Sequence, residues 1–435
     1  MSSIYQTPLY QRIHEQLGSV AMVDCHEHLE RESQWPSGDG IRIGRLFMQY
    51  ANGDLVSAGM SQQDMTDATT YGSKLDSRQQ WELIEPWYRK AWNTAFCQAI
   101  RESIRGLWGF EDITGENLDA IVDGMRKALV PGFTRRLFDK ANIKVAMQNP
   151  TDGRLIYDGK YPSDCFVIDM VDSFSVPTPL SIAEFSREAN LDILDLDDYL
   201  RAVDWYFERH ARSASAYKIS RAYGRTLSFQ DVPKAAVESI FQRARDIRDR
   251  PDMSESLRLE DFLIHYVVRK CGEHGLPVKF HTGIHAGNGN EITNSRAALM
   301  ANLFLKYPNT RFDMYHISYP YQEELLTIAK TFPNVTIDFA WMWAVNPAGA
   351  RRALSDMLDA VPANKIHGFG GDYRAVELVL GHAIIARREI ARVLAQKVEE
   401  GSFSEDYAMQ VGGMLLHDNA WENFDLASKW GSAKA

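Results

Sequence analysis

The second half of the chain alternates between short hydrophobic runs and amphipathic segments, and this alternation limits the fold more than any other feature. The runs are rich in β-branched and aromatic residues and occupy 277–283, 310–318, 334–341 and 365–372. The segments between them have apolar residues at helical spacing, and each ends at a proline. Strands that alternate with helices in this way predict a parallel sheet.

The spacing of marked residues extends the pattern to a closed barrel. His281 and His316 are 35 residues apart, and His316 and Asp372 are 56 residues apart with one further strand between them. Each strand–helix unit therefore takes about 30 residues, as eight units do in a barrel of about 250 residues. Candidate strands at 19–29, 142–150, 165–174 and 213–220 bring the count to eight. We predict an α/β fold, a TIM-type (β/α)8 barrel.

Residues 30–141 are too long for a simple connection after the first strand. Their pattern is mostly helical, and an insertion at this point would lie over the carboxyl-terminal face of the barrel, where catalytic loops gather. Two further helical patterns, at 375–400 and 404–425, are expected to pack outside the barrel. Because no repeat or flexible linker divides the chain, we expect residues 1–435 to form a single domain.

Histidines and one aspartate follow the predicted strands. His26 and His28 are two residues apart, so on a strand both side chains face the same way, with Cys25 opposite. Taken alone, such a pair more often marks two histidines in a polar turn. Three more runs, however, end in a possible ligand: His281, His316 and Asp372. Imidazole and carboxylate groups that converge at one barrel mouth predict a site for zinc, manganese or iron.

Other residues near the predicted mouth could contact a substrate. Arg221 and Arg225 follow the fourth strand, and guanidinium groups suit carboxylates, although both could instead form surface ion pairs. Trp341 and Trp343 follow the seventh strand and could form apolar walls, although core packing is an equal alternative. His285 lies in a glycine-rich loop that lacks the signature of a phosphate-binding loop and could line the pocket.

The series of strand-end residues resembles the amidohydrolase superfamily, closest to the amidohydrolase-related branch that includes the barrel half of nodulin/glutamine synthetase-like fusion proteins. The passages that carry the resemblance are KFHTGIHAGNGNEI, MYHISYPYQEELLTIAKTFPNVTIDFAW and GGMLLHDNAWENFDL. The insertion, with LWGFEDITGENLDAI, is also similar to uronate isomerases, which are distant members of the superfamily. Its members mostly hydrolyse amides or lactones, whereas some branches decarboxylate aromatic acids or isomerise uronates.

The resemblance also implies residue roles. Asp372 would accept the proton of metal-bound water, and His316 would polarise the substrate carbonyl or, in a two-metal site, bind a second ion; we favour the first of these two roles. Lys218 occupies the position of a carboxylated lysine that bridges two ions, although it could also cap a strand or bind a substrate carboxylate. The implied metal ligands are His26, His28, His281 and Asp372.

These roles lead to a prediction of function. We predict a metal-dependent hydrolase with one divalent ion, zinc before manganese, that attacks an amide or lactone of a small acidic substrate; a second ion requires a carboxylated Lys218. The alternatives are a decarboxylase of an aromatic or unsaturated acid, a uronate isomerase, and a non-catalytic binding barrel. Homo-oligomers are common in the superfamily, so the resemblance implies a possible homo-oligomer.

Composition limits the partners and the compartment. The 48 basic and 58 acidic residues give a net charge of −10 without a basic cluster, which argues against nucleic acid. Four scattered cysteines are too few to staple a fold of this size and fit a reducing compartment. The sequence has no signal-like start and no apolar stretch of about 18 residues, so we expect a cytoplasmic protein without membrane contact.

Overall fold

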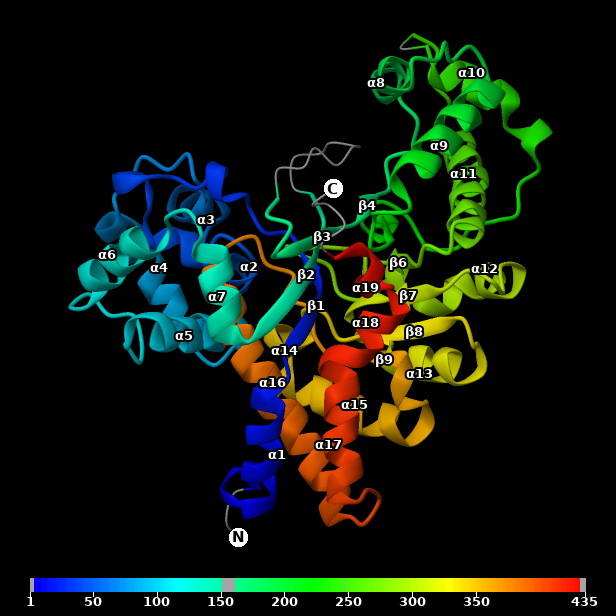
Figure 1. Ribbon diagram of the computed structural model, residues 1–435. Helices are drawn as coiled ribbons and strands as arrows, with labels where there is room; N and C mark the ends of the chain where they lie inside the picture. Colours follow the sequence, from blue (N-terminus) through cyan, green and yellow to red (C-terminus); the bar gives the residue numbers. More distant parts are fainter. Residues whose placement is uncertain (1–3, 151–160, 247, 431–435) are drawn as a thin grey trace.

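The computed structural model describes residues 4–150, 161–246 and 248–430 (Figure 1). Every strand pair in it is parallel, and the strands form two sheets, β1-β2-β3 and β4-β5-β6-β7-β8-β9. The strands are β1 (Met22–Glu27), β2 (Ile143–Gln148), β3 (Phe166–Ile168), β4 (Met170–Val171), β5 (Tyr217–Ile219), β6 (Val278–Phe280), β7 (Phe312–Met314), β8 (Val335–Asp338) and β9 (Ile366–His367).

The two sheets join into one barrel. Only Asp169 separates β3 from β4, so these two short strands together form the third of the eight strands of the barrel. On the other side, Cys25 N donates to Phe369 O at 3.0 Å, and Asp372 N donates to His26 O at 2.8 Å. These bonds join β1 to the chain that follows β9 and so close the barrel. Its eight strands lie where the sequence predicts them.

The helices α2 to α7 lie between β1 and β2 and form the blue-to-cyan group in Figure 1. Local signals set their ends: Asp76 begins α4 with a capping box, and the Thr94 side chain caps α5. Arg45 ties this segment to the rest of the chain through an ion pair with Glu377 at 2.6 Å. The helices are α2 (Ala51–Ser57), α3 (Gln62–Thr69), α4 (Ser77–Ala91), α5 (Ala95–Trp108), α6 (Leu118–Ala128) and α7 (Phe133–Ala141).

The strands from β3 to β9 are connected mainly through helices that cover the outside of the barrel (Figure 1). They shield strands whose residues are nearly all buried, as parallel barrels require. These helices are α8 (Pro179–Ala189), α9 (Leu196–His210), α10 (Glu238–Ala244), α11 (Met253–Glu273), α12 (Ala301–Lys306), α13 (Gln322–Thr331), α14 (Met342–Val345) and α15 (Pro347–Ala360).

The final helices behave in two ways. As predicted, α16 packs outside the barrel, where it lies beside α1. The last turns of the chain, around α18 and α19, instead pack against side chains that the strands point into the barrel. There, Phe424 and Leu426 pack with Val23, Val145 and Val167. The helices at the two ends of the chain are α1 (Pro8–Ser19), α16 (Glu377–Glu399), α17 (Glu405–Gly413), α18 (Asn419–Asn423) and α19 (Leu426–Lys429).

No helix of the described ranges has both the length and the apolar character needed to cross a bilayer.

Candidate functional site

Three of the predicted metal ligands meet where their strands end. His26 Nε2 and His28 Nε2 each lie 3.5 Å from Asp372 Oδ1, and the three ligand atoms all lie within 4.8 Å of one another. His26 is 1% exposed, whereas the side chain of His28 is 34% exposed. The group therefore lies at the carboxyl-terminal mouth of the barrel with one open side.

Burial keeps both imidazoles of this group neutral. Desolvation, together with the positive charge of Lys218, holds the pKa of His26 well below its usual value and lowers the pKa of His28 to about 3. A neutral imidazole keeps one nitrogen lone pair, and that lone pair is what a metal ion needs. The donor set of two neutral imidazoles and one carboxylate therefore fits a divalent ion.

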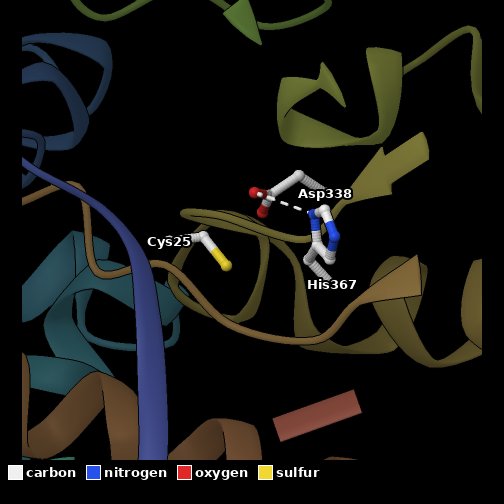
Figure 2. Close-up of side chains that lie close together, drawn as sticks. All are labelled: Cys25, Asp338 and His367. Carbon is white, nitrogen blue, oxygen red and sulfur yellow. Dashed lines mark ion pairs between the residues drawn. The ribbon is translucent and has the colours of Figure 1, made fainter. Parts of the chain in front are cut away.

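The expected orientation of Cys25, opposite the two histidines, is wrong. The register of β1 shifts between Asp24 and Glu27, so strict alternation does not hold there. Cys25 instead points into the barrel, close to Asp338 and His367 (Figure 2). Desolvation raises the pKa of its thiol well above the usual value, which makes it a poor nucleophile.

His281 lies outside the group of three and faces His316. His281 Nδ1 is 3.2 Å from His316 Nε2. The outer nitrogens face backbone carbonyls: His281 Nε2 lies 2.9 Å from Ile284 O, and His316 Nδ1 lies 2.8 Å from Ala340 O. Because a carbonyl only accepts, the outer nitrogens carry the protons and two lone pairs face each other. This arrangement favours a cation or a substrate proton near the pair.

The backbone around Asp372 is held in an unusual conformation. Asp372 has a φ of 62°, and its carbonyl oxygen accepts hydrogen bonds from Tyr50 Oη and from Gln49 Nε2, the latter at 3.3 Å. A Cβ atom at Gly371 would lie 1.9 Å from Glu27 Oε1, so only glycine fits before the aspartate. Gln49 and Tyr50, from the segment between β1 and β2, thus hold the backbone of Asp372, which follows β9.

The side chain of Asp372 sits among nitrogen atoms. Its Oδ2 lies 3.6 Å from His316 Nε2, on the side away from the Oδ1 contacts. Desolvation raises the pKa of Asp372 to about 7, although the charge of Lys218 acts in the opposite direction. The carboxyl group can therefore hold or release a proton near neutral pH.

Lys218 is buried close to the metal group. It lies on β5, is 1% exposed, and its Nζ has no hydrogen bond within the described part of the chain. Its Nζ lies 3.8 Å from the centroid of the Tyr315 ring, which supports the ammonium from one side. Desolvation lowers its pKa to about 7, whereas the charge of Asp372 raises it.

The two arginines predicted to bind a substrate are engaged elsewhere. Arg221 forms a forked pair with Glu260, with an Nε to Oε1 distance of 2.6 Å. Arg225 is 7% exposed and donates to Asp261 Oδ1 at 2.6 Å. Both acidic partners lie on α11, so these guanidinium groups anchor the loop after β5 to that helix.

The aromatic residues divide between the site and the core. The Trp341 ring centroid lies 5.3 Å from that of His316, which places the indole at the mouth. Trp343 instead donates from Nε1 to Gly368 O at 2.8 Å inside the core. The two separate because Trp341 has a φ of 70° and the strand has already ended. His285 stacks on His281 with the centroids 5.5 Å apart.

Sequence reasoning missed three residues around the mouth: Tyr50, Tyr315 and Arg374. Arg374 follows Asp372 by two residues and has a side chain that is 47% exposed, and its charge contributes to the low pKa of His28. The segment GGDYR places Arg374 two residues after the predicted metal ligand Asp372, and this proximity was the signal in the sequence. No pattern relates Tyr50 to Asp372, because 322 residues separate them.

Comparisons with known proteins add a second line of argument. Uronate isomerase from Sphingopyxis alaskensis is 24% identical over 473 aligned residues, which cover 97% of this chain and 96% of that protein. Uronate isomerase from Phenylobacterium zucineum is 23% identical, with 94% and 92% covered. The fluG protein of Emericella nidulans is 24% identical over 216 residues, and that alignment spans only 23% of its length.

Solved structures show the same fold. Glucuronate isomerase from Caulobacter crescentus superposes with a TM-score of 0.78 at 15% identity, over 96% of this chain and 94% of that one. Uronate isomerase from Thermotoga maritima also gives 0.78, at 14% identity, over 98% and 99%. The prediction of a TIM-type barrel is thereby confirmed.

The predicted activity is wrong. We predicted a hydrolase, with a decarboxylase as the main alternative, but the relatives that align along the whole chain are uronate isomerases. The predicted superfamily is confirmed. The sequence pattern of the amidohydrolase family matches residues 176–400, which is more than half of the chain, and a group of possible metal ligands lies at the barrel mouth. The chain therefore belongs to the amidohydrolase family.

Proposed function

We propose that this chain is a metal-dependent isomerase of a uronate, a sugar that carries a carboxylate. The observation that carries the proposal is the alignment with uronate isomerases over nearly the full length of both chains. The site is compatible with it, because isomerisation needs a proton-transferring group beside an ion and consumes no water. In the reaction, a proton leaves C2 and one is added to C1, while a hydrogen moves from O2 to O1.

His26, His28 and Asp372 would hold the ion. Their buried, neutral nitrogens and the carboxylate lie within 4.8 Å of one another, which fits a divalent cation. Zinc is the first candidate and manganese the second, since imidazole and carboxylate ligands accept both. When bound, the ion supplies Lewis-acid polarisation of the substrate carbonyl and hydroxyl oxygens.

We assign the carbon-bound proton to Asp372. Its Oδ1 faces the two imidazoles of the metal group, whereas its Oδ2 lies 3.6 Å from His316 Nε2. The second oxygen can therefore take the proton from C2 and return it to C1. The ammonium of Lys218 would stabilise negative charge on the substrate oxygens, because it is buried and has no hydrogen-bond acceptor within the described residues.

The substrate carboxylate needs a cation, and Arg374 is the best placed. Its Nη2 lies 3.7 Å from Glu30 Oε1, and its half-exposed side chain leaves donors available on the side of His28. Arg221 and Arg225, by contrast, are held by Glu260 and Asp261. Trp341 would form an apolar wall beside the sugar ring.

A direct assay tests the proposal. The purified chain, loaded with Zn²⁺ or Mn²⁺, is incubated with D-glucuronate in D2O, and ketose formation and deuterium at C1 of the ketose are followed by NMR. We expect both signals, and we expect Asp372→Asn to lose both while the fold is retained. A metal-loaded protein that converts no uronate in a panel of hexuronates would contradict the proposal.

A further inference from the structure

A second group of possible metal ligands lies inside the barrel, away from the mouth. It consists of Cys25 on β1, Asp338 on β8 and His367 on β9, and Figure 2 shows the three side chains turned toward one another. Cys25 is 1% exposed and the other two are fully buried. Tyr315 separates this group from the mouth, because its ring packs on His26 while its hydroxyl donates to Cys25 O at 2.9 Å.

Two carboxylate oxygens beside this group have no hydrogen-bond donor among the described residues. Asp338 Oδ1 accepts from Ala340 N at 2.6 Å, but Asp338 Oδ2 has no partner. Asp313 Oδ1 accepts from Thr336 Oγ1 at 2.8 Å, but Asp313 Oδ2 likewise has none. A buried carboxylate oxygen without a donor is costly, so a proton or a cation is needed at this place.

The nearby cation does not fill that need. Lys279 Nζ lies 3.0 Å from Asp169 Oδ2 and 3.0 Å from Cys25 O, so its charge is already matched. His367 Nδ1 lies 3.0 Å from Asp313 Oδ1 and 3.8 Å from Asp338 Oδ2, so one imidazole faces two carboxylates. Asp313 and Asp338 therefore lie together in the barrel interior with less positive charge than negative.

The donor atoms suit zinc in kind and spacing. Cysteine sulfur, imidazole nitrogen and carboxylate oxygen are all zinc ligands, and in a tetrahedral zinc site the ligand atoms lie about 3.3 to 3.8 Å apart. The ligand atoms of Cys25, Asp338 and His367 already lie within 4.8 Å of one another. The Asn423 amide lies 2.9 Å from His367 Nε2, and once rotated by 180° its oxygen accepts a hydrogen bond from that nitrogen. The proton of the imidazole is then on Nε2, and Nδ1, 3.0 Å from Asp313 Oδ1, offers its lone pair to an ion between them.

We propose that Cys25, Asp338 and His367, with Asp313 as the fourth ligand, bind a second divalent ion, Zn²⁺ by its ligand set, in the interior of the barrel. Binding replaces the proton of the thiol, which is released, and the sulfur binds as a thiolate. The site is independent of the proposed isomerase activity.

The position of this group suggests what the ion would do. Within the described residues, β1 and β9 belong to different sheets and share no ladder. The barrel closes there through separate backbone bonds to the chain after β9 and through bonds from that chain to the side chains of Asp24 and Glu27. An ion held by Cys25, Asp338 and His367 would link β1 to β8 and β9 across this seam. Its role is therefore structural, in contrast to the ion at the mouth.

Cobalt substitution tests the proposal, because only the interior site contains sulfur. The full chain is produced in medium with Co²⁺ as the added metal, and cobalt per chain is measured by plasma mass spectrometry together with near-ultraviolet absorption. We expect about two cobalt ions per chain and a thiolate-to-cobalt charge-transfer band. The mouth variant His26→Ala/His28→Ala should lose one ion and keep the band.

The variant Cys25→Ser should lose the band and one ion, with the mouth ion retained. Cys97→Ser is the matched control, since Cys97 is also buried but lies on α5 and belongs to neither group. If Cys25→Ser does not fold, Asp338→Asn replaces it and should weaken the band. Wild-type protein without a sulfur band, or a band that Cys25→Ser leaves intact, overturns the proposal and assigns the place to a shared proton.

Discussion

The mouth and the interior of the barrel both contain histidine and aspartate side chains, but in very different surroundings. Both regions draw on β1, with His26 in the first and Cys25 in the second. At the mouth, the His28 side chain is 34% exposed, whereas the interior group has no member above 1%. The difference indicates that the place along a strand, more than the residue type, decides whether a polar cluster can meet a substrate or can only stabilise the fold.

Chelation should separate the two regions most strongly. Because the mouth is open and the interior is closed, we expect dialysis against EDTA to remove the mouth ion and all isomerase activity while the interior ion stays. Metal content and activity are followed together over time. Equal rates of loss from both places would show that solvent reaches the interior as easily as the mouth.

Asp372→Asn should have the next largest effect. Loss of the carboxylate that takes and returns the proton is expected to lower kcat by about 10²- to 10⁴-fold. Circular dichroism should be unchanged, since Asn keeps the backbone bonds from Gln49 and Tyr50. A variant with near-normal kcat would move the proton transfer to another group.

Lys279→Met should act on stability. The change leaves Asp169 as an unpaired buried carboxylate, which is expected to lower the free energy of unfolding by about 3–5 kcal/mol. Urea denaturation measures the change, and the double variant Lys279→Met/Asp169→Leu should recover most of it. A loss below about 1 kcal/mol would mean that the pair is well solvated.

Tyr50→Phe should have the smallest effect. It removes one hydrogen bond to the carbonyl of Asp372, and a bond of this kind contributes about 0.5–1.5 kcal/mol. We expect kcat to fall by no more than about tenfold, with little change in unfolding. Tyr88→Phe, whose bond to Asp112 stays within the same helical segment, is the control and should keep full activity.

The fold could be predicted because barrel strands leave a repeated mark. Each hydrophobic run of the sequence contains one strand of the barrel, and the runs recur at intervals of about 30 residues because each unit consists of one strand and one helix. The break at Asp169 could not be predicted, because the hydrophobic run at 165–174 has the pattern of one continuous strand. Nor does helical periodicity indicate that Phe424 turns inward beneath the strands.

The site could be predicted only in part. His26, His28 and Asp372 follow from their positions at strand ends, and the structure brings them together. The orientation of Cys25 was missed because a register shift in β1 has no signal in the residue types. The activity was missed because a ligand set does not specify a reaction, and the superfamily uses similar ligands for several reactions.

The contact of Gln49 and Tyr50 with Asp372 has a consequence for engineering. Loops over a barrel mouth are natural candidates for exchange between relatives when a new specificity is wanted. Here, such a graft would also replace the two side chains that hold the backbone of Asp372. A successful chimaera should therefore keep this dipeptide and vary the helices beyond it.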